Sequence, residues 1–451
     1  MLIHKFSFLG TLVVLDVNSG SVHIVDELLH NLLDIFDGSN HDEVKRYFTN
    51  KYSEKDIVEG LAELDDLIAE NILFSPAAQA TDVFQEQPLV KSLCLHVAHD
   101  CNLRCKYCFA GTGDFGTRRS LMGKETGEKA IEFALKGSGS RKNIDIDFFG
   151  GEPLVNSEVV RHLINYARQR EQETGKKLKL TLTTNGVLLD AEMTGFLDKN
   201  NVLLVLSLDG RPEVHDRMRP FAGGKGSYAR VTENFIRTIK ARGGRNYYLR
   251  GTYTKENLDF TEDVKHMATL GKELSMEPVV DKEAWYRIQE DDLPQIFREY
   301  EKLSEFYLDR YFAGCPFNFF HFNLDLDGGP CLIKRLSGCG AGHEYFAITP
   351  DGDIYPCHQF VGREEYLLGN LEEGVKKSEI GDIFRNAHVL NKPNCMACWA
   401  RFYCSGGCHA NADLINGDIY QPYEIGCQLQ RKRLECAIGI QVKIAEKERF
   451  A

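Results

Sequence analysis

The sequence contains no apolar run near the roughly 20 residues that a membrane-spanning helix needs, and its N-terminus shows no signal-peptide pattern. It also lacks an excess of positive charge, because 54 Lys and Arg against 66 Asp and Glu give a formal net charge of -12. An acidic protein has no general means of neutralising phosphates. These absences predict a cytoplasmic protein that binds neither membrane nor nucleic acid.

What the sequence does contain is cysteine, with 14 in 451 residues. A disulfide framework is not expected in the cytoplasm, so the cysteines predict metal ligation. The length exceeds what one simple core can organise, which predicts two or three domains.

Residues 1–75 are predicted to form a small winged-helix-like domain. Short alternating apolar runs between residues 5 and 25 indicate three strands, and a helical period follows over 26–36, 41–48 and 54–70. Residues 76–90 are interpreted as a linker.

Residues 91–314 alternate apolar strands with amphipathic helices, which predicts an α/β fold with a parallel sheet in right-handed units. Six such units make a partial (β/α)6, TIM-like barrel, whose ligands are expected at the carboxyl ends of the strands. Residues 315–451 are cysteine-dense and are expected to order around metal centres. The expected strands are 92–97, 143–149, 178–184, 203–208, 247–254 and 275–280, and the expected helices include 124–135, 157–170, 191–199, 231–242 and 260–270.

Three cysteines follow the first of these strands in the loop Cys101-Asn-Leu-Arg-Cys105-Lys-Tyr-Cys108. Three thiolates at this spacing can bind three irons of a cubane iron–sulfur cluster and leave the fourth iron without a protein ligand. A substrate or co-substrate can bind there, so the cluster is expected to be reactive. The alternatives are a zinc site, which prefers four closed ligands, and thiols clustered by chance.

The C-x3-C-x2-C spacing, with Tyr107 before the last cysteine, resembles the signature of the radical S-adenosylmethionine (SAM) enzymes. The resemblance implies that Cys101, Cys105 and Cys108 hold a 4Fe-4S cluster whose open iron binds SAM. Reductive cleavage of SAM then gives a 5′-deoxyadenosyl radical that removes hydrogen from an unactivated carbon.

Motifs at the ends of the next three strands extend the resemblance. In radical SAM enzymes a Gly-Gly-Glu-Pro element holds the SAM amino group, and its glycines are expected to let the backbone approach the ligand closely. Ser207 and Arg219 match a pair that binds the SAM carboxylate in related enzymes, although a surface ion pair is the alternative for Arg219. The expected SAM contacts are Tyr107, Gly150, Gly151, Glu152, Pro153, Thr184, Asn185, Ser207, Asp209 and Arg219, and no catalytic side chain is assigned.

Seven of the remaining eleven cysteines resemble the SPASM extension of radical SAM enzymes that modify peptides. This resemblance implies one auxiliary 4Fe-4S cluster on Cys395, Cys398, Cys404 and Cys427, and another on Cys339, Cys357 and Cys408. Three 4Fe-4S clusters are therefore expected in all. Seven thiolates leave one auxiliary iron without a ligand, and either another cysteine fills this position or it is open. Cys331 is the obvious candidate, and the other spare cysteines are Cys94, Cys315 and Cys436. A hairpin with Asp351-Gly352 at its turn is expected between Cys339 and Cys357, and structural zinc is the alternative for residues 395–408.

The runs around Cys331–His343 and Tyr355–Gly362 resemble the maturases of SCIFF ("six cysteines in forty-five residues") peptides, relatives of the sactipeptide synthases. The resemblance implies a Cys-rich precursor peptide as substrate, whose leader adds a strand to the N-terminal domain. The product is an intramolecular thioether, and a ferredoxin or flavodoxin is the expected type of electron donor.

Two other functions remain as alternatives. A sulfatase maturase forming formylglycine has an Asp base after the cysteine that corresponds to Cys357, whereas this sequence has His358. A non-catalytic iron–sulfur electron carrier has no need of the Gly150–Pro153 element. The precursor, the acceptor carbon, the number of bridges and the oligomeric state are not given by the sequence.

Overall fold

The computed structural model describes residues 2–77, 89–326 and 336–449. Cys331, the candidate extra ligand, lies outside the described residues. Among these residues, eleven strands form one sheet in the order β10-β9-β8-β7-β6-β5-β4-β11-β12-β13-β14, and a second sheet has the order β1-β2-β3. No described helix is long and apolar enough to cross a membrane.

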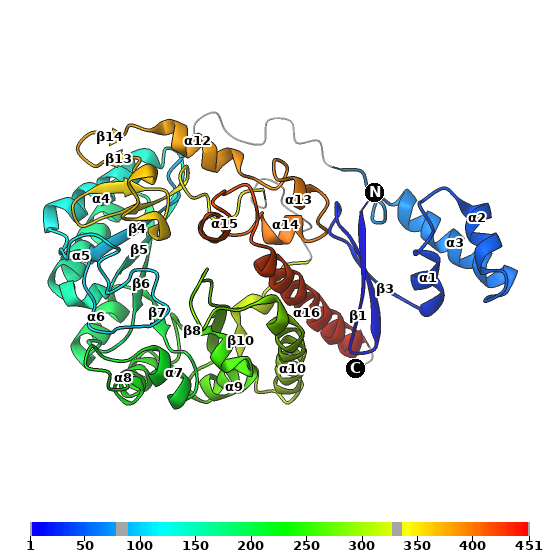
Figure 1. Cartoon of the computed structure of the whole chain (residues 1–451), viewed down its shortest axis with the longest axis horizontal. Coiled ribbons are helices and arrows are strands. Elements are labelled where there is room, and N and C mark those ends of the chain that lie inside the picture. The colour runs from blue at the N-terminus through cyan, green and yellow to red at the C-terminus, as the bar shows by residue number, and fades with distance from the viewer. Residues whose placement is uncertain (1, 78–88, 327–335, 450–451) are drawn as a thin grey trace.

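Six parallel strands in chain order form the middle of the large sheet, with helices between them, which confirms the predicted partial barrel (Figure 1). The strands are β4 Ser92–Ala98, β5 Asn143–Gly150, β6 Lys177–Thr184, β7 Leu203–Ser207, β8 Tyr247–Tyr253 and β9 Glu273–Pro278. The helices are α4 Lys124–Gly137, α5 Ser157–Thr174, α6 Ala191–Lys199, α7 Pro212–Met218, α8 Tyr228–Ala241, α9 Phe260–Leu270 and α10 Leu293–Phe312.

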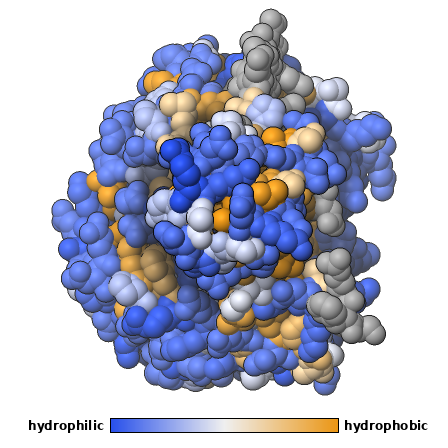
Figure 2. Space-filling view, turned by 90° about the vertical axis from the view of Figure 1, so that its right-hand side faces the viewer, coloured by the Kyte–Doolittle hydropathy of each residue, from blue (hydrophilic) through white to orange (hydrophobic). Residues whose placement is uncertain are grey.

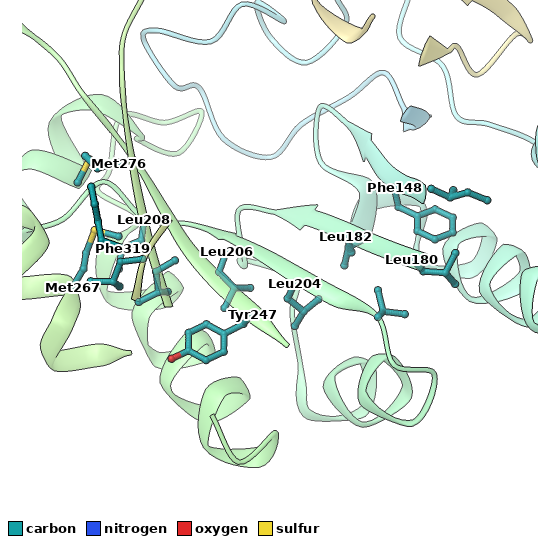
Figure 3. Close-up of a cluster of buried hydrophobic side chains, with 14 of the residues drawn as sticks. Phe148, Leu180, Leu182, Leu204, Leu206, Leu208, Tyr247, Met267, Met276 and Phe319 are labelled. Atoms are coloured by element: carbon teal, nitrogen blue, oxygen red, sulfur yellow. The ribbon is translucent and has the colours of Figure 1, made fainter. Parts of the chain in front are cut away.

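Every second residue of these strands packs against the surrounding helices. Phe148, Leu182 and Leu206 are fully buried and extend from neighbouring strands into this core (Figure 3). Because side chains alternate along a strand, the residues between them, such as Asp147 and Ser207, face the inside of the barrel. The apolar alternation of the sequence therefore separates a hydrophobic outer layer from a polar interior.

The cysteine-rich segment continues the barrel sheet. Strand β11 pairs in parallel with β4, so that Tyr345 lies opposite Ser92 and Ile348 opposite Leu95. The predicted hairpin is confirmed, with Gly352 at φ +91° in its turn. The elements are β10 Asn318–Phe319, β11 Tyr345–Ile348, β12 Asp353–Tyr355, β13 Gly369–Asn370, β14 Gly374–Val375, α12 Ser378–Asn386, α13 Pro393–Met396, α14 Arg401–Cys404, α15 His409–Asn416 and α16 Glu424–Arg449.

The N-terminal part has three antiparallel strands followed by three helices, as expected. One side of its sheet buries Phe6 and Phe8 in the main core beside α16, while Val14 joins a separate core with the helices. His4 stacks on Trp399 of the cysteine-rich segment at 3.8 Å between ring centroids. Viewed from the side of the N-terminal helices, the surface is mostly hydrophilic with small apolar groups (Figure 2). The elements are β1 Ile3–Phe8, β2 Thr11–Asp16, β3 Val22–Val25, α1 Glu27–Leu32, α2 His41–Phe48 and α3 Glu54–Ala69.

Candidate functional site

The three-cysteine loop leaves the carboxyl end of β4, and backbone hydrogen bonds hold it to a neighbouring segment. Arg104 N–H donates to the Pro220 carbonyl at 2.8 Å, and Lys106 N–H donates to the Met218 carbonyl at 2.9 Å. The Cys101 sulfur accepts the Leu103 N–H at 3.4 Å. The loop is thus shaped by the protein itself, with donors already directed at a ligand sulfur.

Burial works against ionisation of these thiols. It raises the pKa of Cys101 to about 12 and that of Cys105 to about 11. Because the thiolate is the form that binds metal, iron has to displace these protons, and cluster assembly should release them. The protein supplies the positions of the sulfurs, and iron supplies the driving force for their ionisation.

Gly150 and Gly151 are required for contact with the cysteine loop itself. A Cβ at Gly150 would lie 2.3 Å from the Ala98 carbonyl oxygen, and one at Gly151 would lie 2.3 Å from that of Asp100. Gly151 N–H also donates to the Ala98 carbonyl at 2.9 Å. The glycines were expected to let the backbone approach SAM. In this structure they let the Gly150–Gly151 backbone approach the segment Ala98–Asp100, and this contact fixes the start of the cysteine loop.

Glu152 lies at the centre of the polar network behind the loop. Its carboxylate accepts the Thr184 hydroxyl at 2.7 Å, the Asn185 N–H at 2.8 Å and the Leu154 N–H at 3.0 Å. Burial raises the pKa of Glu152, while these hydrogen bonds favour its ionised form. Pro153 follows as the first residue of a short 3-10 helix. Four of the expected SAM contacts therefore meet at one carboxylate and its neighbours.

Asn185 links this network to the cluster loop. Its side-chain amide donates to Asn102 Oδ1 at 2.8 Å and lies 3.7 Å from the Cys101 sulfur. Asn102 was not predicted, and its buried Nδ2 has no hydrogen-bond partner among the described residues. Asn102 lies inside the cysteine motif, directly after Cys101, and this position was the signal that could have indicated a site residue.

Tyr107, Asp209 and Arg219 form a second buried group. Tyr107 donates its hydroxyl proton to Asp209 at 2.5 Å, and Arg219 donates to the Tyr107 oxygen at 2.7 Å. The guanidinium lies 3.6 Å from Asp209. Burial raises the pKa of Asp209 against the opposing effect of Arg219. The alternative of a surface ion pair for Arg219 is wrong, because both partners are buried.

Arg250 is a site residue that sequence reasoning missed. It lies directly opposite Ser207 in the parallel pairing of β7 with β8, so both side chains face the barrel interior. Within residues 2–77, 89–326 and 336–449 no hydrogen bond or close ion pair engages its guanidinium, although it acts electrostatically on Asp147, Glu277 and His358. A hydroxyl beside a free cationic fork can bind a carboxylate.

Four cysteines of the second set surround one small cavity. They lie on or next to α13, α14 and the start of α16, and they are Cys395, Cys398, Cys404 and Cys427. Burial raises the pKa of Cys395 to about 11 and that of Cys427 to about 12. The four thiols expected to share one cluster are thus brought together from segments about 30 residues apart in the chain.

Cys357, Cys408 and Cys339 form a third group. Burial raises the pKa of Cys357, and the neighbouring Cys408 and Cys339 thiols add to this effect. Cys357 also accepts the Gln359 N–H at 3.4 Å. Of the remaining cysteines, Cys94 is fully buried on β4, as expected for a core residue, and Cys436 is buried on α16.

The donor groups fit clusters better than single ions. In the described part of the chain, no three Cys, His, Asp or Glu side chains converge on one point where they could hold a metal ion. Zinc needs its sulfur ligands about 2.3 Å from a common centre, whereas a cubane places each thiolate on a different iron. The thiols of Cys101 and Cys357, each of which accepts a backbone N–H, fit the second arrangement.

His358 lies between the third group and the cluster loop. Its ring is 5.4 Å from that of Phe109 and 5.1 Å from that of Phe149, between centroids, and its Nδ1 is 2.9 Å from the Tyr345 hydroxyl oxygen. Burial, with Arg250 adding to it, lowers the pKa of His358 to about 4. The ring of His358 is therefore neutral. It stands at the position where a sulfatase maturase has an Asp base.

Two family models match the chain. "Radical SAM superfamily" covers residues 95–268, and "Iron-sulfur cluster-binding domain" (SPASM) covers residues 339–408. Among curated proteins, the radical SAM cyclopropyl synthase TigE of Paramaledivibacter caminithermalis is 23% identical over 76% of this chain and 72% of that protein. A cysteine-type anaerobic sulfatase-maturating enzyme of Clostridium perfringens is 25% identical over 76% of this chain and 95% of its own.

Solved structures share the fold. The structure of anSMEcpe with bound AdoMet superimposes with a TM-score of 0.65 at 21% identity, covering 79% of this chain and 99% of that one. Streptococcus suis SuiB bound to S-adenosylmethionine has a TM-score of 0.52 at 16% identity and covers 94% of this chain and 98% of its own. The chain belongs to the radical SAM superfamily, and it is a radical SAM enzyme with a SPASM iron–sulfur domain.

Proposed function

We propose that this enzyme forms intramolecular thioether cross-links in a ribosomally made, Cys-rich precursor peptide. One observation carries the peptide substrate: a small sheet with an open edge packs directly beside the cysteine-rich domain. Strand β3 pairs with β2 on one side, and no other described strand pairs with its opposite edge. The structure of anSMEcpe with bound AdoMet and Kp18Cys peptide, with a TM-score of 0.63, supports peptide binding in this fold.

SAM and a reduced 4Fe-4S cluster, when bound, supply the radical that takes a hydrogen atom from the acceptor carbon of the peptide. The residues Cys101, Cys105 and Cys108 would hold this cluster, and Asn185 would position SAM beside Cys101. Ser207 and Arg250 would bind a carboxylate of SAM, while Arg219 keeps Tyr107 and Asp209 in place.

We further propose two auxiliary 4Fe-4S clusters, one on Cys395, Cys398, Cys404 and Cys427 and one on Cys339, Cys357 and Cys408. The second group leaves one iron position for a substrate thiolate, which would hold the sulfur close to the acceptor carbon. A low-potential donor of the ferredoxin or flavodoxin type would supply the electrons.

The test is to incubate the reduced enzyme and SAM with a Cys-rich precursor and to analyse the product by mass spectrometry. A thioether removes two hydrogen atoms and keeps the sulfur, whereas formylglycine formation removes the cysteine sulfur. We expect the wild type to form the thioether. If the auxiliary iron is open to substrate, Cys331→Ala should form it as well. Loss of an auxiliary cluster from Cys331→Ala would show that Cys331 fills the position, and a desulfurised product would establish the alternative.

That alternative, maturation of a sulfatase, is favoured by the matches to sulfatase-maturating enzymes. The residue after Cys357 counts against it, because this chain has His358 where a sulfatase maturase has an Asp base. The match of residues 95–268 to the radical SAM superfamily counts against a simple electron carrier, which has no need of the Gly150–Pro153 element.

The open edge of β3 should bind the leader of the precursor through added backbone hydrogen bonds. Ile24 on this strand is 50% exposed, and Ile236 on α8 is a matched control at 47%. We expect Ile24→Asp to raise the Kd for full-length precursor about tenfold, equivalent to about 1.4 kcal/mol, and Ile236→Asp to leave it unchanged. Binding can be measured by fluorescence anisotropy with a labelled leader.

Cleavage of SAM without peptide should stay at the wild-type rate in both variants, because β3 is remote from the barrel interior. Equal leader affinity in Ile24→Asp and Ile236→Asp would show that the leader binds elsewhere.

A further inference from the structure

Lys392 is a fully buried cation without a carboxylate partner. Its side chain has no exposed surface, and its ammonium group donates one hydrogen bond, to the Gly406 carbonyl at 3.0 Å. Across the residues that the structure describes, no Asp or Glu lies within ion-pair distance of it. An ammonium group in a protein interior is strongly unfavourable unless an opposite charge compensates it.

The groups around Lys392 are thiols of the two proposed auxiliary clusters. Burial lowers the pKa of Lys392, and four thiols oppose this by acting on its charge: Cys395, Cys404, Cys408 and Cys427. His409 and His388 also lie near, and burial, with Lys392 adding to it, lowers the pKa of each. An imidazole ring is either neutral or cationic, so neither ring supplies a negative charge. The compensating charge therefore has to come from the cysteines and what they bind.

The position of Lys392 relates it to both auxiliary groups. Gly406 lies in the short turn that connects Cys404, of the four-cysteine cavity, with Cys408, of the other group. Three successive residues of this turn, Ser405, Gly406 and Gly407, have φ of +58°, +85° and +74°. A side-chain donor from the start of α13 thus holds the backbone midway between ligands of two metal centres.

We propose that Lys392 is the shared counter-charge of the two auxiliary clusters and a positioning residue that sets their reduction potentials. The proposal rests on the two auxiliary clusters proposed above. Reduction adds one electron to a cluster that already carries negative charge. A nearby ammonium stabilises the reduced form more than the oxidised form, which makes the potential less negative.

The experiment is a potentiometric titration of the reconstituted enzyme, followed by electron paramagnetic resonance. The variant Lys392→Met removes the charge at similar volume, and Lys392→Arg keeps it. We expect both auxiliary clusters of Lys392→Met to shift to more negative potentials, and those of Lys392→Arg to stay near wild type. The SAM cluster on Cys101, Cys105 and Cys108 is the internal reference and should not move.

Full iron content with unchanged potentials in Lys392→Met would overturn the proposal. If Lys392→Met does not take up auxiliary iron, the iron content of Lys392→Arg decides. Auxiliary iron retained in Lys392→Arg would support the role of the positive charge. Loss of auxiliary iron from both variants would show that Lys392 acts through its shape, which overturns the proposal. Iron analysis of the wild type comes first, since absence of auxiliary iron would refute the cluster assignment rather than the role of Lys392.

Discussion

Replacing Cys101, Cys105 and Cys108 together by Ala should abolish production of 5′-deoxyadenosine. The three sulfurs share one loop, and the hydrogen bonds from Leu103 and Asn185 direct donors at Cys101. No other cysteine group on the barrel side can replace them among the described residues. With dithionite as reductant, liquid chromatography of the products should show only background cleavage of SAM.

The iron content of the same variant tests the rest of the assignment. Three cubanes contain about twelve irons, so the variant should retain about eight. Cys315→Ala is the control, because Cys315 belongs to none of the three groups, and it should cleave SAM at the wild-type rate. Deoxyadenosine production that survives the triple substitution would disprove the assignment of the SAM cluster. An iron content near four in the wild-type enzyme would refute the two auxiliary clusters.

The second large effect is expected from a single methyl group at Gly151. The Cβ of an alanine there would lie 2.3 Å from the Asp100 carbonyl oxygen and 2.9 Å from the Gly113 Cα, both of them backbone atoms. Since backbone cannot rotate away as a side chain can, Gly151→Ala should displace the start of the cysteine loop. We expect a loss of stability of about 1–3 kcal/mol, the usual range for overpacking, and loss of about four irons.

Gly195→Ala provides the matched control for this prediction. Gly195 lies in α6, and a Cβ there meets no atom within 4 Å. This substitution should keep the full iron content and leave stability unchanged or raised by up to about 1 kcal/mol, because Ala favours the helix. Thermal unfolding and iron analysis of both variants decide the outcome. Full iron and normal SAM cleavage in Gly151→Ala would contradict the role given to this contact.

Local patterns predicted the barrel well. The expected helices at 191–199 and 260–270 coincide with α6 and α9, and each of the six expected strands is present with ends shifted by at most two residues. These segments carry their own signal, since apolar residues recur at the helical period or alternate along a strand. The loop of Cys101, Cys105 and Cys108 was equally accessible, because spacing within a short loop requires no knowledge of distant contacts. The two auxiliary groups span longer stretches of the chain, and only the resemblance to the SPASM extension implied them.

Features that depend on distant contacts could not be predicted in this way. The sequence pattern does not predict helix α16, because Gly439 weakens the helical pattern. In the structure a Cβ at this position would lie 2.2 Å from the ring of Phe8, so the glycine makes room for an N-terminal strand. Likewise, Arg250 gains its meaning only from Ser207 on the neighbouring strand, and the two belong to different motifs of the sequence.

The pairing of β11 with β4 has a consequence for electron transfer. Strand β4 leads directly into the loop of Cys101, and the hairpin that begins with β11 ends at Cys357. A continuous ladder of backbone hydrogen bonds therefore spans the two segments that are proposed to hold clusters, where a flexible linker would let their separation vary. Tunnelling rates fall steeply with distance, so a fixed spacing keeps the rate between these centres nearly constant while a peptide enters or leaves.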